Sequence, residues 1–374
     1  MHYSPLVQVK NRVLVGQPLP FNVRDNDGTL MLARGQVIAT DAHRIALFER
    51  GALVDVAELM SPLDQIKTAP HSELPRMWKV CVNRLGQTLR ESEKDGFVDA
   101  MQDAAIPVLA LIERDKDLAI FNILRHQGNE HVQYGVNHSM HAAITGALVA
   151  QRLGWNEEDA QRVFKTALTM NISMLELQGQ LSLQTTPPTP DQRTAIKAHP
   201  AFSRLLLEMS GVTDADWLRA VSEHHEAPDG SGYPSGTREA CDIAALVRRV
   251  DIYTAKLSPR STRSAMAADK AGRMMFMQDP GHPMTAALVK EFGVYPPGCF
   301  VRLISGEVGL VVRRGPTVMT PIVAVLTSPY GNHLSEPVRR DTSQKEYAVH
   351  SVLGGAHSAE DSITPEKLMA VAMA

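Results

Sequence analysis

Two adjacent histidines, His224 and His225, are the residues of this sequence best suited to chemistry. They stand at the end of an expected helix, and a turn that contains Gly230 and Gly232 follows them directly. Imidazole is the commonest side-chain metal ligand, so two neighbouring histidines at a helix end can point toward one or two cations. The helix dipole alone also favours histidines at a helix end, and the pair by itself leaves both roles open.

The expected helix and turn give the histidine pair a defined position. Asp216 can cap the helix, and Trp217 and Val221 share a face with the histidines at helical spacing. The two histidines therefore lie on the apolar face of this helix, at its C-terminal end. The segment beyond it contains residues that favour sharp turns, namely Asp229, Gly230, Gly232 and Pro234.

The run from His224 to Pro234 resembles the second signature of the HD-GYP family, which comprises metal-dependent phosphohydrolases that open cyclic di-GMP in bacteria. The resemblance extends over roughly residues 130 to 300. It implies a helical domain with histidines and carboxylates aimed at its centre, as in other metal-binding helical bundles. It also implies two metal ions that hold a hydroxide for in-line attack on a phosphodiester.

The resemblance implies three more metal ligands beside His224 and His225. His138 lies near the start of a helix expected over residues 134–154, and His199 lies in a segment similar to the third ligand segment of the family. Asp251 lies at the edge of the apolar stripe of a helix expected from about 242 to 257. Taken singly, such a histidine is more often packed than bound to metal, and such an aspartate is more often exposed or ion-paired.

The eponymous His-Asp doublet of the family is missing. A helix capped by Asn156 carries an apolar stripe that passes through Met170 and Asn171, where the family places this doublet, and Met174 stands in place of a lysine. An aspartate bridges two ions through two anionic oxygens, whereas Asn171 has one neutral carbonyl oxygen. Met170 offers only a soft thioether and is more typical of a core residue. Asn171 requires a hydrogen bond if it is buried.

The turn and the segment after Asp251 supply the remaining family positions. The signature residues of the turn, which need not touch a metal, are Asp229, Gly230, Gly232, Tyr233 and Pro234. Tyr233 could stack on a guanine or anchor the loop by packing. Arg260 and Arg263 match a basic segment and could bind phosphate or neutralise nearby acids. Tyr134 stands where trinuclear members carry a glutamate, which argues against a third metal.

These observations lead to a functional expectation. The resemblance implies a protein of bacterial cyclic di-GMP signalling that acts by nucleotide binding or by contacts with diguanylate cyclase (GGDEF) domains, with weak or no hydrolysis. A divalent metal such as iron or manganese is expected at weak or partial occupancy, because four imidazoles and one carboxylate leave most of the charge of two ions unmatched. The alternatives are an active phosphodiesterase that uses the surviving ligands and a scaffold without nucleotide affinity.

The expected elements form a mainly α protein with β modules at both ends. Apolar runs at Val13–Val15, Phe21–Val23 and Leu30–Leu32 predict a β-rich N-terminal module, with a hairpin turn at 25–28 and a helix at 40–50. Further apolar runs after Phe292, at Cys299–Leu303, Val308–Val312 and Ile322–Leu326, predict a small β subdomain. The expected organisation is a module at 1–60, a linker at 61–75, a helical connector at 76–129, the HD-GYP-like domain at 130–290, the β subdomain at 291–352 and a tail at 353–374 with a short helix after Thr364.

The composition limits the functional class. With 44% hydrophobic and 21% charged residues, the chain is typical of a globular protein with a sizeable core. A net charge of -3 without a basic stripe argues against DNA binding, so a phosphate ligand needs a local site. The three cysteines have no metal-ligand spacing, and no apolar stretch is long enough for a membrane span. The N-terminus has neither the basic region nor the apolar region of a signal peptide. We therefore expect a cytoplasmic protein.

Overall fold

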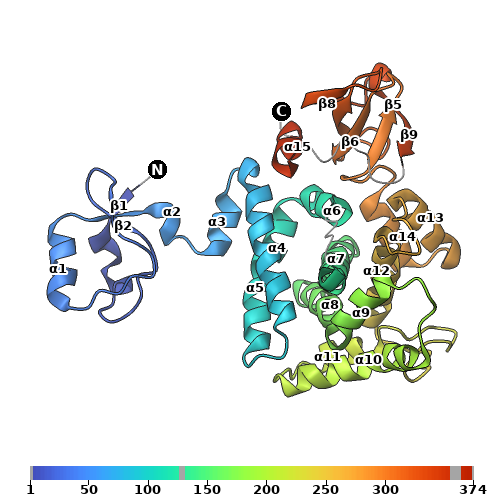
Figure 1. The fold of residues 1–374 in the computed structure, drawn as a ribbon, viewed down its shortest axis with the longest axis horizontal. Helices are drawn as coiled ribbons and strands as arrows, with labels where there is room; N and C mark the ends of the chain where they lie inside the picture. Colours follow the sequence, from blue (N-terminus) through green and yellow to red (C-terminus); the bar gives the residue numbers. More distant parts are fainter. Residues whose placement is uncertain (1–2, 126–130, 354–363, 373–374) are drawn as a thin grey trace. The chain divides into compact units, whose positions relative to one another are not determined.

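The structure is a computed structural model that describes residues 3–125, 131–353 and 364–372. The chain divides into two compact units, Met1–Ala69 and Pro70–Ala374. Figure 1 shows the helices and strands of both units and labels most of the helices and several of the strands. The expected class, a helical domain with small antiparallel sheets toward both ends of the chain, is confirmed.

The first unit is built on a four-stranded sheet of order β1-β4-β2-β3. Its elements are β1 (Tyr3–Pro5), η1 (Leu6–Arg12), β2 (Val23–Arg24), β3 (Leu30–Leu32), α1 (Asp41–Glu49), β4 (Leu53–Asp55), α2 (Val56–Leu59) and α3 (Pro62–Thr68). The predicted hairpin turn forms, with the Gly28 N–H donating to the Asp25 carbonyl at 3.0 Å. The predicted helix α1 is capped by the Thr40 side chain. The run Val13–Val15 was wrong as a strand, since it follows η1 and joins no sheet.

The segment expected to be a linker, residues 61–75, is largely helical. It contains α3, η2 (His71–Glu73) and the start of α4 (Leu74–Arg90). Pro62 and Pro75 occupy the first turns of α3 and α4. Proline is tolerated there because the first turn of a helix leaves its N–H groups unpaired in any case. Both prolines therefore mark helix starts within the segment expected to be a linker.

The second unit is a helical domain arranged around α7 (His131–Arg152). The other helices before the C-terminal sheet are α5 (Phe97–Arg114), α6 (Lys116–Arg125), α8 (Glu157–Thr169), η3 (Ile172–Met174), α9 (Leu175–Leu183), α10 (Pro190–Met209), α11 (Ala215–Glu223), α12 (Asp242–Leu257), α13 (Ala268–Gln278) and α14 (Pro283–Phe292). Helix α7 contacts α8, α9, α12 and α14 (Figure 1). Gly146 permits the close approach of α8, because a Cβ there would lie 2.7 Å from Val163 Cγ1.

The C-terminal sheet has five antiparallel strands in the order β8-β7-β6-β5-β9. Its strands are β5 (Phe300–Leu303), β6 (Val308–Arg313), β7 (Ile322–Thr327), β8 (His333–Asp341) and β9 (Val349–Leu353), with η4 (Lys345–Tyr347) before the last. The first three strands match the predicted apolar runs. Strand β8 was missed because it is a mostly exposed edge strand. The predicted tail helix forms as α15 (Pro365–Val371), capped by Thr364.

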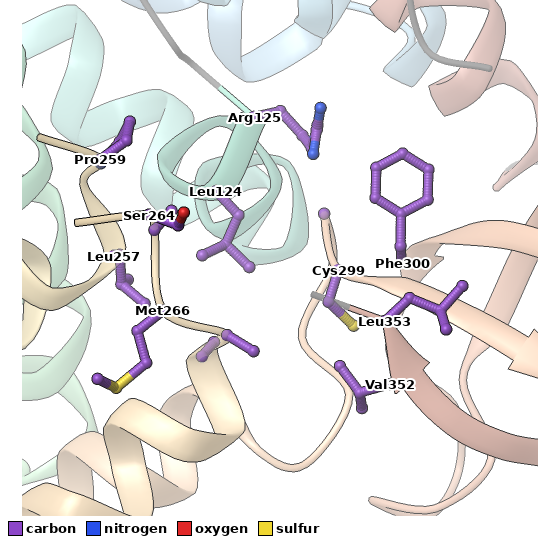
Figure 2. A pocket seen from close by; sticks show the side chains of 14 residues that line it. Leu124, Arg125, Leu257, Pro259, Ser264, Met266, Cys299, Phe300, Val352 and Leu353 are labelled. Carbon is purple, nitrogen blue, oxygen red and sulfur yellow. The ribbon is translucent and has the colours of Figure 1, made fainter. Parts of the chain in front are cut away.

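The sheet meets the helices through ion pairs and a small cavity. The Arg314 N–H donates to Asp117 Oδ2 at 2.9 Å, and its guanidinium pairs with Glu291 Oε1 at 3.2 Å. A cavity of about 250 Å³ lies at this junction. Figure 2 shows the side chains that line it. At its rim the Arg125 guanidinium lies 5.0 Å from the centre of the Phe300 ring. The finer division of this unit into connector, HD-GYP-like domain, β subdomain and tail remains our proposal.

Candidate metal centre

Helices α10 and α11 position two of the histidines. Helix α10 begins with a capping box between Thr189 and Gln192, and it buries His199. Helix α11 is capped by Asp214, whose carboxylate accepts from the N–H groups of Asp216 and Trp217, so the expectation that Asp216 caps it was wrong. Asp214 is also held by Arg162, with 3.0 Å between Arg162 Nε and Asp214 Oδ2. The helix ends at Glu223 with His224 as the C-terminal cap, as predicted.

His199 and His224 face each other through their Nε2 atoms at 3.1 Å. The Nδ1 of His199 lies 2.6 Å from the carbonyl of Ile196, and the Nδ1 of His224 lies 2.6 Å from the carbonyl of Val221. A carbonyl only accepts, so each Nδ1 carries the proton of a neutral ring. Both Nε2 atoms then present lone pairs to each other. A cation between them removes that repulsion.

Burial keeps these rings neutral. Burial, and after it the adjacent His224, lower the pKa of His199 to about 3. Burial also lowers the pKa of His224, against the opposing effect of the Val221 carbonyl. The pKa of His225 is depressed well below its ordinary value by burial and by His224. Metal ions bind unprotonated imidazole, so these rings are in the form that a metal requires.

His225 completes a cluster of three imidazoles. One ring nitrogen each of His199, His224 and His225 lies within 4.8 Å of the others. The His225 ring stacks on Tyr233, with centroids 4.5 Å apart and an interplanar angle of 26°. Tyr233 thus anchors the loop by packing on His225. Burial raises the pKa of the Tyr233 hydroxyl.

His138 and Asp251 form a separate pair. His138 Nε2 lies 2.7 Å from Asp251 Oδ1, so helices α7 and α12 are joined at this point. Burial alone would raise the pKa of Asp251, but the hydrogen bond with His138 and the surrounding histidines lower it below its ordinary value. His138 Nδ1 is buried without a partner among the described residues. His138 lies about two turns inside α7, so its expected place at the helix start was wrong.

The five predicted ligands thus form two groups. His199, His224 and His225 come together, while His138 and Asp251 bond to each other. The two groups are electrostatically coupled. The negative charge of Asp251 works to raise the pKa of His199, His224 and His225, against the larger effect of burial.

The spacing of the facing His199 and His224 nitrogens fits two ligands of one metal ion. Two nitrogens held at about 2.0–2.1 Å by one tetrahedral ion lie about 3.3 Å apart. The observed Nε2 separation of His199 and His224 is 3.1 Å. Three imidazoles form a donor set that catalytic zinc sites use, and imidazole also suits iron.

The residues at the doublet position are buried between α8 and η3. Met170 is fully buried and Asn171 is 3% exposed. The preceding Thr169 accepts from Trp217 Nε1 at 3.0 Å, which fixes this turn against α11. Met174, in place of the family lysine, is also buried. The buried doublet position therefore holds a methionine and an asparagine, and it offers neither an imidazole nor a carboxylate to a metal.

The loop after His225 folds back on the histidine pair. A Cβ on Gly232 would lie 2.4 Å from Ala227 N and 2.5 Å from His225 O, so only glycine fits this approach. Gly230 has a φ of +79°, which also favours glycine. Asp229 is exposed and accepts from Ser231, which lowers its carboxyl pKa. The loop residues therefore shape the site without adding a ligand to the cluster.

Two contacts of the site were not recognised in the sequence. Glu226 is 3% exposed, and its Oε1 accepts from the Ser235 N–H at 2.7 Å. The available signal for this hydrogen bond was a glutamate directly before a glycine-rich turn. Tyr134, considered only as the replacement of a glutamate, accepts from Arg260 Nε at 2.9 Å and stacks parallel to His138 with centroids 6.3 Å apart.

The two predicted arginines are placed differently. Arg260 is exposed, and its guanidinium carbon lies 5.7 Å from the centre of the Tyr134 ring. Arg263 donates to the carbonyl of Ala255. Arg260 is therefore held beside His138 through Tyr134, whereas Arg263 closes the turn after α12.

Comparisons with known proteins bear on this arrangement. Residues 129–279 match the HD domain family. A cyclic di-GMP phosphodiesterase of Pseudomonas aeruginosa is 27% identical over 252 residues, or 66% of this chain and 58% of the relative. A 3'3'-cGAMP-specific phosphodiesterase of Vibrio cholerae is 28% identical over 171 residues, or 44% of this chain and 36% of the relative. This chain therefore spans little more than half the length of the first relative.

A solved structure supports the fold. An HDG"Y"P protein from Bdellovibrio bacteriovorus aligns with a TM-score of 0.50 and 14% sequence identity over 77% of this chain and 98% of that chain. In the described part of the chain, no helix is long and apolar enough to cross a membrane. The chain therefore contains an HD domain at residues 129–279, and its phosphodiesterase relatives and this fold support its resemblance to the HD-GYP family.

Proposed function

We propose that this chain binds a cyclic dinucleotide, cyclic di-GMP in the first instance, in bacterial signalling, and that it hydrolyses the nucleotide weakly or not at all. One observation carries the proposal: Met170 and Asn171 occupy the buried doublet position while the histidine cluster is retained. The relatives named as cyclic di-GMP phosphodiesterases support the choice of ligand.

The donor set supports weak binding of one ion. His199, His224 and His225 would hold a divalent metal such as iron or manganese, which would activate water when bound. Their imidazoles are neutral, and Asp251 is engaged by His138. Asn171 adds no negative charge where the family has a bridging carboxylate. The charge of a second ion would remain largely unmatched, so we expect single and partial occupancy.

Arg260 is the residue we expect to meet a phosphate of the nucleotide. Its Nε is fixed by the Tyr134 hydroxyl, and Tyr134 in turn stacks beside His138. A guanidinium held in this way can offer its remaining N–H groups to a phosphate in a defined direction. The overall charge of -3 gives no general attraction for an anion, so such a local contact is needed.

Protein contacts are the second part of the proposal. The turn over residues 229–236 is largely exposed around Asp229 and Ser231. The family resemblance implies contacts between this region and diguanylate cyclase domains, and we propose a partner of that kind for this chain.

An active phosphodiesterase is the competing proposal. The intact histidine cluster and the names of the relatives favour it. In that case the surviving ligands would support turnover with one ion, or with two in an unusual shell. A scaffold without nucleotide affinity is the third alternative.

Calorimetry and product analysis separate these functions. Cyclic di-GMP and 3'3'-cGAMP are titrated into the protein with and without manganese or iron, and release of linear dinucleotide or GMP is followed. Binding of at least one nucleotide with negligible product supports the proposal. Clear turnover that is abolished by His224→Ala establishes the active phosphodiesterase, and absence of binding to both nucleotides establishes the scaffold.

A further inference from the structure

A second cavity lies between α4, α6 and α7. Its volume is about 320 Å³. Sites for small molecules typically have volumes of about 300–1,000 Å³. None of the described residues that line it belongs to the candidate metal centre. The cavity is therefore a separate feature that the proposed nucleotide site does not use.

The walls of this cavity are mostly apolar and buried. They include Trp78 and Val82 of α4, Phe121 of α6, and Met140 and Ile144 of α7. Each of these side chains is at most 7% exposed. Helices α4 and α7 approach closely beside the cavity, since a Cβ on Gly86 would lie 3.3 Å from Val136 Cγ1 and 3.6 Å from Met140 Cε. The walls are thus held by packed helices and suit an apolar or aromatic body.

The charge of the lining is of one sign. Lys79 is exposed at the cavity and forms no ion pair with any described residue. Asn83 and Thr364 are also exposed there. No acidic side chain occurs among the described lining residues. The cavity therefore combines a mostly apolar interior, whose polar members are the buried His141 and the half-buried Asn122, with a cationic, hydrogen-bonding mouth.

We propose that this cavity binds a small amphipathic carboxylate. Its apolar or aromatic body would lie against Trp78 and Phe121, and its carboxylate would lie at the mouth beside Lys79. Burial of the body supplies the affinity, and the ammonium group selects an anion over a neutral molecule of the same length. Helix α7 also carries His138, so an occupant of this cavity contacts a helix that contributes to the candidate metal centre.

Decanoate is a suitable probe, used below its micellar concentration with the full chain. Binding is measured by calorimetry and by tryptophan fluorescence, because Trp78 lines the cavity. We expect saturable binding of one decanoate, at least tenfold weaker binding of decanol, and at least tenfold weaker binding of decanoate by Lys79→Glu. Lys290→Glu, an exposed charge reversal on α14, is the matched control and should bind as the native protein does.

A second variant reports on the cavity itself. Val82→Phe fills part of the volume and should weaken decanoate binding, with folding checked by circular dichroism and thermal unfolding. Lys79 is exposed, so Lys79→Glu should keep its fold even if Val82→Phe does not. The proposal is overturned if decanoate does not bind, if decanol binds equally well, or if Lys79→Glu and Lys290→Glu bind decanoate with the same affinity.

Discussion

The Nε2 atoms of His199 and His224 face each other at 3.1 Å, while each Nδ1 is bonded to a backbone carbonyl three residues earlier. In neutral rings this places two lone pairs against each other. Burial keeps both rings neutral, so no proton relieves the contact at physiological pH. The arrangement is electrostatically unfavourable without a cation and favourable with one.

The first prediction concerns binding of a single ion. Titration of the metal-free protein with Co²⁺ should produce visible ligand-field absorption that saturates at one ion per chain. His224→Ala should weaken this binding at least tenfold, because one of the two facing donors is lost. His43→Ala, which removes an exposed histidine of α1, is the control. Equal Co²⁺ affinity of His224→Ala and His43→Ala would contradict the assignment.

The second prediction concerns the pH dependence of stability without metal. The pKa of His199 is about 3 in the folded state, against an ordinary value of 6.5. Below pH 6.5 the unfolded chain binds a proton that the folded chain does not. The free energy of unfolding therefore decreases as the pH is lowered. The slope from this one group approaches about 1.4 kcal/mol per pH unit.

Urea unfolding in EDTA between pH 6.5 and 5.0 measures this effect. His199→Gln should lose about 2 kcal/mol of the pH dependence over that interval. His43→Gln should retain it, since that side chain is exposed. An unchanged pH slope in His199→Gln would show that His199 protonates freely in the folded protein.

The third prediction concerns the phosphate contact. Arg260→Ala should weaken cyclic dinucleotide binding about tenfold, because a charge-assisted hydrogen bond to phosphate is lost. Tyr134→Phe should weaken it less, since the guanidinium remains but loses its fixed direction. Arg273→Ala, an exposed arginine of α13, serves as the control in calorimetry. Unchanged affinity in Arg260→Ala would remove Arg260 from the nucleotide site.

The fourth prediction compares two glycines. Gly232→Ala should lower the thermal stability and weaken Co²⁺ binding, because the new Cβ would collide with backbone atoms of Ala227 and His225. Gly272→Ala is the matched change, because Gly272 lies in the interior of α13. A Cβ there would lie 3.7 Å from the Val289 side chain, which is an ordinary contact. Gly272→Ala should leave metal binding unchanged and raise stability by about 0.5–1 kcal/mol. Equal effects of the two substitutions on metal binding would contradict a shaped loop.

Local patterns allowed much of the fold to be predicted. Helix α12 has the predicted bounds because its apolar stripe is continuous and buried. Helix α8 begins after Asn156, whose side chain accepts from the Asp159 N–H. The cap of α11 was misassigned because Asp214 and Asp216 are both suited to capping. The choice depends on contacts within the fold, where Arg162 holds Asp214.

The arrangement of the site could not be predicted from the sequence. The candidate ligands were identified one by one, and their role as ligands remains a prediction. Their separation into a histidine cluster and a bonded His138–Asp251 pair depends on distances between helices. No local pattern encodes these distances. The same holds for Tyr134 and Arg260, which are 126 positions apart in the chain and form a hydrogen bond.

The most direct test of the degenerate site is a comparison of the native protein with the double variant Met170→His/Asn171→Asp. Metal content and release of linear dinucleotide or GMP from cyclic di-GMP are measured side by side, with Met170→Leu as a packing control. Restoration of an anionic bridging carboxylate and a further imidazole should raise both metal content and rate at least tenfold. Efficient hydrolysis by the native protein, with no gain in the double variant, would contradict the account.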